Sequence, residues 1–168
     1  MARITRRACD DKIDYFEGDL GKRVPAVRQL ESPRTGVREN FAASIFNGRV
    51  SARANLALMR ERPAAQRFTA TTLERHPQST QSFFPLTAER YLVVVCGSDS
   101  SGDPDLDTLR AFECDRNQAV SYAAGTWHMG MKTLGEEGTF AMLVHEDGGS
   151  GDCEFREVDP FEVRIGGQ

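Results

Sequence analysis

Hydrophobic and polar residues alternate with a period of two over much of the chain after residue 54, which is typical of β-strands. Clusters of proline, glycine and aspartate separate these short runs at intervals that suit a sandwich or a barrel. The pattern predicts strands over residues 54–59, 67–76, 81–86, 91–97, 118–122 and 140–145, and a final strand pair over residues 153–165. We therefore expect a mainly β protein.

The clearest of these strands covers residues 91–97, where the sequence reads Tyr-Leu-Val-Val-Val-Cys-Gly. Its residues are apolar at every position and include a run of three β-branched valines, so both faces of the strand are expected to be buried. This strand should lie in the middle of the core. The polar residues 99–103 and the glycine-rich residues 148–152 are interpreted as connecting loops.

One or two short helices are also predicted. For a helix over residues 104–112, Asp103 can act as the N-terminal cap and Pro104 suits the first helical position. The apolar residues along one face of that helix would be Leu106, Leu109 and Phe112. One or two further helical turns are expected over residues 40–46, ended by an Asn-Gly pair that is equally typical of a hairpin turn.

Length and charge narrow the range of functions. A chain of 168 residues is expected to form one domain. Its net charge of -4 gives no reason to expect nucleic acid or an anionic membrane as a partner. No apolar run approaches the ~18 residues that span a bilayer. The basic N-terminus is not followed by an apolar segment, so a secretory signal is not expected.

The four cysteines, Cys9, Cys96, Cys114 and Cys153, are widely spaced. They form no Cys-x-x-Cys pair, which argues against a zinc knuckle and against a dithiol redox site. Reduced thiols in a cytoplasmic protein are the simplest interpretation.

Residues 119–131 combine small residues, aromatic residues and one imidazole, and the rest of the chain can be interpreted as their scaffold. Gly125 lies between two strand-like runs, which indicates a tight bend or a close approach of the backbone to a ligand. Tyr122, Trp127 and His128 flank this glycine. The alternative is that the aromatic residues only fill the core beside a turn.

A second candidate pair comes from the strand predicted over residues 67–76. Residues two apart in a strand share a face, so Glu74 and His76 are expected to point one way and Arg75 the other. Gln81 would continue the face of Glu74 and His76 in the next strand. A carboxylate and an imidazole on one face can carry out acid–base chemistry. The alternative is an exposed glutamate beside a histidine at the rim.

The spacing Gly125-x-x-His128 matches the second half-motif of the cupins, small β-barrels that build a site inside the barrel mouth. A metal-binding cupin offers His-x-His and a downstream glutamate in its first half-motif. The comparable run here has one histidine, His76, and a glutamine, Gln81. A tight divalent metal site is therefore not expected, and a neutral or metal-poor acid–base pocket without a cofactor is favoured, with a weakly bound divalent metal as the alternative.

Several segments together resemble the ureidoglycolate lyase family, formerly called ureidoglycolate hydrolase. In the order and spacing of that family they are Leu73-Glu-Arg-His-Pro77, Thr80-Gln-Ser-Phe-Phe-Pro-Leu86, the Val93 run, residues 104–112, Gln118-Ala-Val-Ser-Tyr122, Gly125-Thr-Trp-His128 and Gly148-Gly-Ser-Gly-Asp-Cys153. The resemblance covers about residues 60–153. Residues 1–50 match the family loosely, and residues 54–165 would form the barrel body of a single cupin-like domain over residues 1–168.

The resemblance implies a cupin-like β-barrel or jelly roll, usually a homodimer, that splits ureidoglycolate into glyoxylate and urea late in allantoin breakdown. This reaction needs a base for the hydroxyl proton and an acid for the leaving nitrogen. The catalytic candidates are His76, His128 and Glu74, and the substrate-binding candidates are Gln81, Tyr122, Trp127 and Arg75. Either histidine can serve as acid or base, and Glu74 can orient His76 or act as base itself. We expect the three catalytic candidates to meet in one concave pocket lined by Tyr122 and Trp127.

The chain departs from the family pattern at two places. After Trp127 the family has His-His-Pro-Leu, whereas this chain has His128-Met129-Gly130-Met131, and Glu146-Asp147 replaces an Asp-Arg pair. Two alternative functions follow. The protein is a divergent enzyme for another carbinolamine, ureido or small carboxylate compound in a biosynthetic pathway, with Met129 and Met131 forming an apolar wall, or it is a non-catalytic cupin-like binding module.

Overall fold

The computed structural model describes residues 2–3, 30–31, 37–38 and 45–165, and within these ranges it contains strands and no helix. In chain order the strands are β1 (Ala2–Arg3), β2 (Leu30–Glu31), β3 (Val37–Arg38), β4 (Arg53–Glu61), β5 (Arg67–Arg75), β6 (Gln81–Pro85), β7 (Arg90–Ser98), β8 (Pro104–Asp115), β9 (Val120–Tyr122), β10 (Trp127–His128), β11 (Lys132–Thr133), β12 (Gly138–Glu146) and β13 (Glu154–Arg164). None of the described segments is a helix with the length and apolar character needed to cross a membrane.

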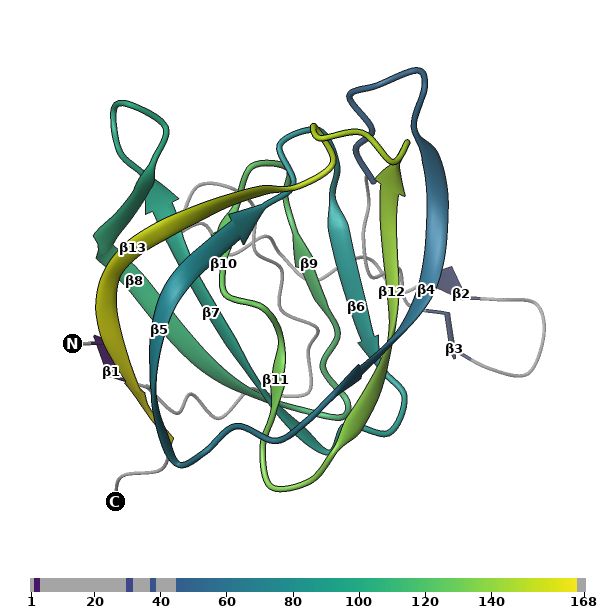
Figure 1. The fold of residues 1–168 in the computed structure, drawn as a ribbon. Coiled ribbons are helices and arrows are strands. Elements are labelled where there is room, and N and C mark those ends of the chain that lie inside the picture. Colours follow the sequence, from purple (N-terminus) through teal and green to yellow (C-terminus); the bar gives the residue numbers. More distant parts are fainter. Residues whose placement is uncertain (1, 4–29, 32–36, 39–44, 166–168) are drawn as a thin grey trace.

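The larger sheet has the strand order β1-β13-β5-β10-β7-β11, and β8 pairs with the other edge of β7. Figure 1 shows that this sheet curls, so that β13 and β5 lie across from β7 and β8. Apolar side chains of β5, β7, β8, β10 and β13 meet inside the curl. We call this cluster the first core; its members include Leu73, Leu92, Val94, Trp127, Phe161 and Val163.

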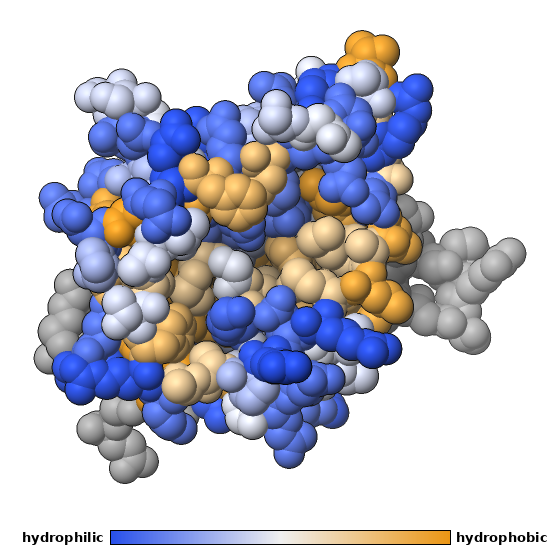
Figure 2. All heavy atoms as spheres, in the orientation of Figure 1, coloured by the Kyte–Doolittle hydropathy of each residue, from blue (hydrophilic) through white to orange (hydrophobic). Residues whose placement is uncertain are grey.

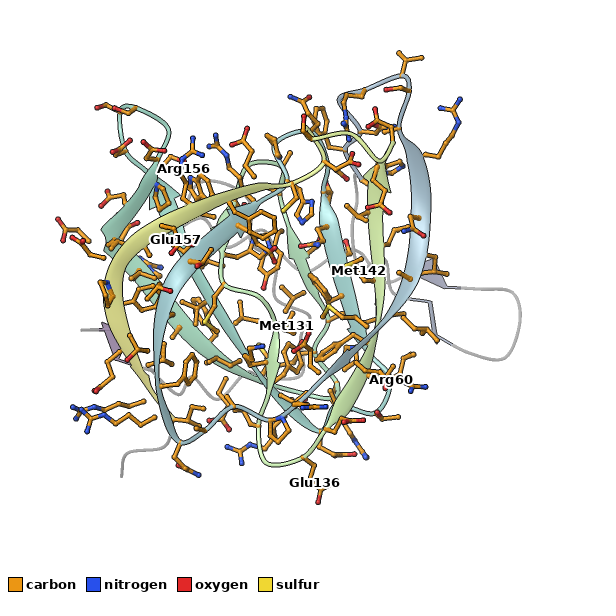
Figure 3. The ribbon with its side chains drawn as sticks, in the orientation of Figure 1. Arg60, Met131, Glu136, Met142, Arg156 and Glu157 are labelled. Carbon is orange, nitrogen blue, oxygen red and sulfur yellow. The ribbon has the colours of Figure 1, made fainter. Side chains whose placement is uncertain are left out.

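The smaller sheet has the strand order β4-β12-β6-β9 and faces the curled sheet (Figure 1). Between the two sheets lies the second core, whose members include Phe83, Tyr91, Val93, Val95, Tyr122 and Phe140. Met131 and Met142 also point into the space between the two sheets (Figure 3). On the face shown in Figure 2, hydrophobic and weakly hydrophobic atoms gather in the middle, and hydrophilic atoms surround them. β2 and β3 form a separate two-stranded sheet.

β7 explains the continuous apolar run predicted over residues 91–97. Its residues alternate between the two cores: Leu92, Val94 and Cys96 face the first, while Tyr91, Val93 and Val95 face the second. Every one of these side chains is buried. The predicted central strand is therefore confirmed, as are the strands predicted over residues 54–59, 67–76, 81–86, 118–122 and 140–145, each of which overlaps an observed strand.

The helix predicted over residues 104–112 is wrong, because this segment forms β8 and pairs antiparallel with β7. Its three-residue apolar spacing has another cause. The pairing shifts register between Val95 and Gly97, which pair with Arg110 and Asp105. The β8 residues between Asp105 and Arg110 therefore have no regular partner on β7. This irregularity lets Leu106 and Leu109, three residues apart, both pack against the first core.

Two further predictions change. The segment 153–165, predicted as a strand pair, is the single strand β13, with a register irregularity between Glu157 and Phe161 in its pairing with β5. Of the helical turns predicted over residues 40–46, residues 40–44 lie outside the described residues. Phe46 is not helical: its N–H donates to Thr80 Oγ1, 2.9 Å away, and its carbonyl accepts from the Thr80 N–H at 3.1 Å.

Candidate active site

The bend predicted at Gly125 is present between β9 and β10. Gly125 has a φ of +83°, a backbone conformation that favours glycine. Its N–H donates to the carbonyl of His76 at 2.9 Å, so the bend is tied to the residue that follows β5. The turn therefore fixes both the end of β9, at Tyr122, and the start of β10 against the segment that carries His76.

β10 places His128 directly beside Glu74. The strand is only two residues long, and His128 pairs with Glu74 of β5 on one side and with Val95 of β7 on the other. Directly opposed residues of antiparallel strands share a face, so all three side chains point toward the second core. His128 Nε2 lies 3.5 Å from Glu74 Oε1, and the side chain of His128 is 2% exposed.

Two more rings complete this group. The His128 imidazole stacks on Tyr122 with ring centroids 4.2 Å apart, and it lies nearly parallel to the His76 imidazole at 5.9 Å. We call Glu74, His76, Tyr122 and His128 the site cluster. These residues come from β5, the segment after it, β9 and β10, so strand pairing and the Gly125 bend bring them together.

Backbone carbonyls set the tautomers of the two histidines. His128 Nδ1 lies 2.8 Å from the carbonyl oxygen of Thr126, and His76 Nδ1 lies 2.8 Å from that of Asp152. A carbonyl oxygen only accepts, so in each neutral imidazole Nδ1 carries the hydrogen and Nε2 is the free base. Both rings are thereby prepared to accept a proton at Nε2.

The charges of the site cluster are coupled. Burial raises the pKa of Glu74, but the facing His128, His76 and the thiol of Cys153 outweigh burial, so the pKa lies below its usual value. Burial and the neighbouring His128 lower the pKa of His76, and the Asp152 carbonyl and the Glu74 and Glu146 carboxylates offset this only in part. At neutral pH the cluster therefore combines a carboxylate with a neutral His76.

Buried polar atoms without a hydrogen-bond partner gather at the same place. In the described part of the chain they include Gln81 Oε1, the Tyr122 hydroxyl and His128 Nε2. Gln81 pairs with Tyr122 across β6 and β9, so the two side chains share a face. Nε2 of Gln81 has only a weak contact, 3.4 Å from Met142 Sδ. Since buried polar groups are normally satisfied, these atoms suit a bound polar ligand.

Cys153 is a neighbour of the site cluster that sequence reasoning missed. Its Sγ lies 3.7 Å from Glu74 Oε2, and burial and the Glu74 charge raise the pKa of the thiol to about 12, so the protonated thiol donates to the carboxylate. Glu74, His76 and Cys153 each offer a metal-ligand atom, all within 4.8 Å of one another. A cation bound there would have to displace the thiol proton. The absence of a cofactor remains a prediction.

Arg75 and Trp127 are not part of the site cluster. They lie on the opposite face of the curled sheet, where the Arg75 guanidinium stacks over the Trp127 ring at 4.4 Å. Trp127 is buried in the first core and donates its indole N–H to the carbonyl of Gly102 at 3.1 Å. Arg75 forms an ion pair with Glu154. Strand alternation explains this placement, because each residue is next in sequence to a member of the site cluster.

The structure shows what surrounds the residues at which the chain departs from the family pattern. Met129 packs into the first core and Met131 into the second, so both side chains fill apolar space. Glu146 contributes a negative charge near His76, and Asp147 is paired with Arg49. Met129 therefore lies on the same face of the sheet as Trp127, away from the site cluster, and the apolar pocket wall expected from Met129 and Met131 is wrong for Met129.

Comparisons with known proteins agree with this arrangement. A sequence model of the ureidoglycolate lyase family matches residues 28–165. A ureidoglycolate lyase of Chelativorans sp. (strain BNC1) is 37% identical over 164 residues, covering 96% of this chain and 93% of the relative. That of Burkholderia mallei (strain NCTC 10229) is 35% identical, covering 88% and 81%. That of Saccharomyces cerevisiae is 48% identical over 79 residues, covering 44% and 40%. The chain therefore belongs to the ureidoglycolate lyase family.

Proposed function

We propose that this protein cleaves ureidoglycolate to glyoxylate and urea by general acid–base catalysis at the site cluster. The observation that carries the proposal is the buried contact of Glu74 with His128, with His76 alongside and unpartnered polar atoms of Gln81 and Tyr122 next to it. The names of its relatives support this substrate. The family resemblance implies that the reaction belongs to the late steps of allantoin breakdown.

In the proposed reaction, Nε2 of neutral His76 takes the hydroxyl proton of ureidoglycolate. The oxygen's electron pair forms the carbonyl of glyoxylate, and the carbon–nitrogen bond breaks with its electrons moving to nitrogen. Protonated His128, its charge balanced by Glu74 at 3.5 Å, donates a proton to that nitrogen, and urea leaves. Proton transfer from His76 to His128 restores the starting state. Each positioned transfer contributes ~10² to 10⁴ in rate.

Gln81 and Tyr122 would hold the substrate during these transfers. Gln81 Oε1 has no protein donor, and a ureido N–H supplies one. Burial raises the pKa of Tyr122, so its hydroxyl stays protonated and can donate to a substrate oxygen. A compound without the ureido group would leave the Gln81 oxygen buried and unpaired, which disfavours its binding.

The direct test is to incubate the purified protein with racemic ureidoglycolate and to measure glyoxylate. We expect release well above the spontaneous background, with consumption stopping near half of the racemate if one enantiomer is used. Glyoxylate release at the background rate in the presence of folded protein would refute the proposed activity.

The pH dependence of kcat/KM should report His76. Because the pKa of His76 lies below its usual value of about 6.5, the base stays neutral through pH 7 and below. The value of kcat/KM should therefore fall through protonation of His76 only as the pH falls below about 6.5. The groups facing His76 are Glu74, His128, Glu146 and the Asp152 carbonyl.

A pH–rate profile corrected for substrate protonation and protein stability would measure this acid limb. His76→Gln should lower the rate and remove the limb. A limb centred above the usual histidine pKa would contradict the assignment of His76 as the neutral base.

We also propose that the protein forms a homodimer through the outer face of the smaller sheet, in a reducing cytoplasm. Leu56 and Leu58 of β4 are 72% and 71% exposed. They pair with Leu143 and Ala141 of β12, so the four apolar side chains share that outer face. Exposed apolar patches of this kind mark interfaces. Cys96 and Cys153 are free thiols, which supports the cytoplasmic location.

Leu58→Glu should weaken the dimer, because each subunit would then bury a carboxylate in the interface. We expect the dissociation constant to rise at least about tenfold. Light scattering after size exclusion at several concentrations measures it. Val50→Glu is the control, since Val50 is 96% exposed and precedes β4. A wild-type monomer at all concentrations, or a Leu58→Glu dimer of unchanged affinity, would contradict this interface.

A further inference from the structure

The loop between β12 and β13 needs side-chain bonds to hold one conformation. Residues 147–152 read Asp-Gly-Gly-Ser-Gly-Asp, and Gly148 has a φ of +79°. Glycine loses the most conformational freedom on ordering, so such a segment is mobile unless it is tied down. The loop nevertheless leads directly into two contacts with the site cluster.

Two carboxylates hold the loop backbone. Asp152 accepts the N–H groups of Asp147 and Gly148, the latter at 2.7 Å. Asp147 accepts the N–H of Gly149 at 3.0 Å and the hydroxyl of Ser51 at 2.6 Å. Like charges repel each other, so a cation between the two carboxylates stabilises this arrangement.

Arg49 supplies that cation. Its Nη1 lies 3.1 Å from Asp147, and its Nη2 forms an ion pair with Asp152. A guanidinium suits this position because its planar fork presents two parallel donors, which a lysine ammonium does not. The Ser51 hydroxyl and the Arg49 hydrogen bond keep the pKa values of Asp147 and Asp152, respectively, below their usual value.

The end of the loop touches both acid–base groups. The Asp152 carbonyl accepts from His76 Nδ1 at 2.8 Å. The next residue, Cys153, donates its thiol to Glu74. The position of this loop end thus determines which nitrogen of His76 carries the hydrogen.

We propose that Arg49 is a positioning residue for the reaction: by bridging Asp147 and Asp152 it holds the Asp152 carbonyl on His76 and so fixes the imidazole with Nε2 free. Its catalytic consequence rests on the proposed function, whereas its effect on the His76 tautomer does not. Arg49 lies far from His76 in sequence and makes no direct contact with the substrate in this scheme.

The test compares Arg49→Met with the wild-type protein by long-range ¹H–¹⁵N NMR of the histidine rings, at a pH where the imidazoles are neutral. We expect wild-type His76 to carry its hydrogen on Nδ1, and Arg49→Met to show a mixture of both tautomers. If the protein cleaves ureidoglycolate, kcat should fall on the order of 10- to 100-fold with a much smaller change in KM. Arg49→Lys should lie between the two, since it restores charge but not the fork.

Arg116→Met is the matched control. It also removes an arginine ion pair, with Glu89, but this pair is exposed and lies beside the start of β7, away from the site cluster. It should leave the tautomer and kcat unchanged. An unaltered His76 tautomer in folded Arg49→Met overturns the proposal, whatever the activity. If Arg49→Met does not fold, Arg49→Lys decides: a wild-type tautomer there overturns the proposal, and a mixture supports it.

Discussion

His76→Ala and His128→Ala are each expected to lower kcat by a factor on the order of 10² or more, because each removes one of the two proton transfers. The double variant should lose much less than the product of the two losses. The imidazoles lie 5.9 Å apart and exchange the same proton in the proposed cycle. Once one histidine is replaced, replacing the other should therefore lower kcat only a little further.

Steady-state assays of the four proteins in this cycle measure the coupling. His145→Ala is the matched control, because His145 is the remaining histidine of the chain and lies outside the site cluster. It should retain wild-type kcat. Since His128 is almost fully buried, His128→Gln and circular dichroism separate lost chemistry from lost folding. Independent, multiplicative losses in folded variants would mean that the two histidines act separately.

Trp127→Ala is expected to lower the free energy of unfolding by about 3–5 kcal/mol. The indole is 0% exposed, packs in the first core, donates to the Gly102 carbonyl and lies under Arg75. Its removal therefore leaves a large cavity and takes away one of the two donors to the Gly102 carbonyl, which also accepts from Arg75 Nη1 at 2.9 Å. Trp127→Phe keeps most of the apolar contact and should lose less than half of that stability.

Urea unfolding followed by circular dichroism measures both variants, because the substitution removes the only tryptophan. The folded fraction of Trp127→Phe should keep the wild-type KM, since Trp127 faces away from the site cluster. An unchanged unfolding midpoint together with a raised KM would contradict this assignment and return Trp127 to the substrate pocket.

Much of the fold is predictable from the sequence, because the alternation of strand faces and the burial of strands determine the pattern of hydrophobic and polar residues. The uninterrupted apolar run over residues 91–97 correctly indicated a strand buried on both faces. Residues 104–112 were mispredicted because an irregularity in β8 repeats the three-residue spacing of a helix. Local propensity cannot reveal that irregularity, because the ladder to β7 decides it.

For the site, alternation was sufficient to place Glu74 with His76 and to separate Arg75 from them. It also implied that Trp127 and His128 face opposite ways, although both had been expected to line one pocket. No sequence pattern indicates that Arg49 or Cys153 lies near the site. Arg49 lies 98 positions before its partner Asp147, and Cys153 lies 79 positions after Glu74, so only tertiary structure brings them together.

For the two-residue strand β10, it matters whether the turn before it gains an odd or an even number of residues. Because β10 is hydrogen-bonded to a neighbour on each side, its frame is fixed, and its two residues exchange faces if the chain shifts by one position. Inserting one residue between Tyr122 and Thr126 would push tryptophan toward Glu74 and histidine into the first core. Two inserted residues would restore the alternation. Anyone who grafts or redesigns this turn should therefore change its length only by even numbers.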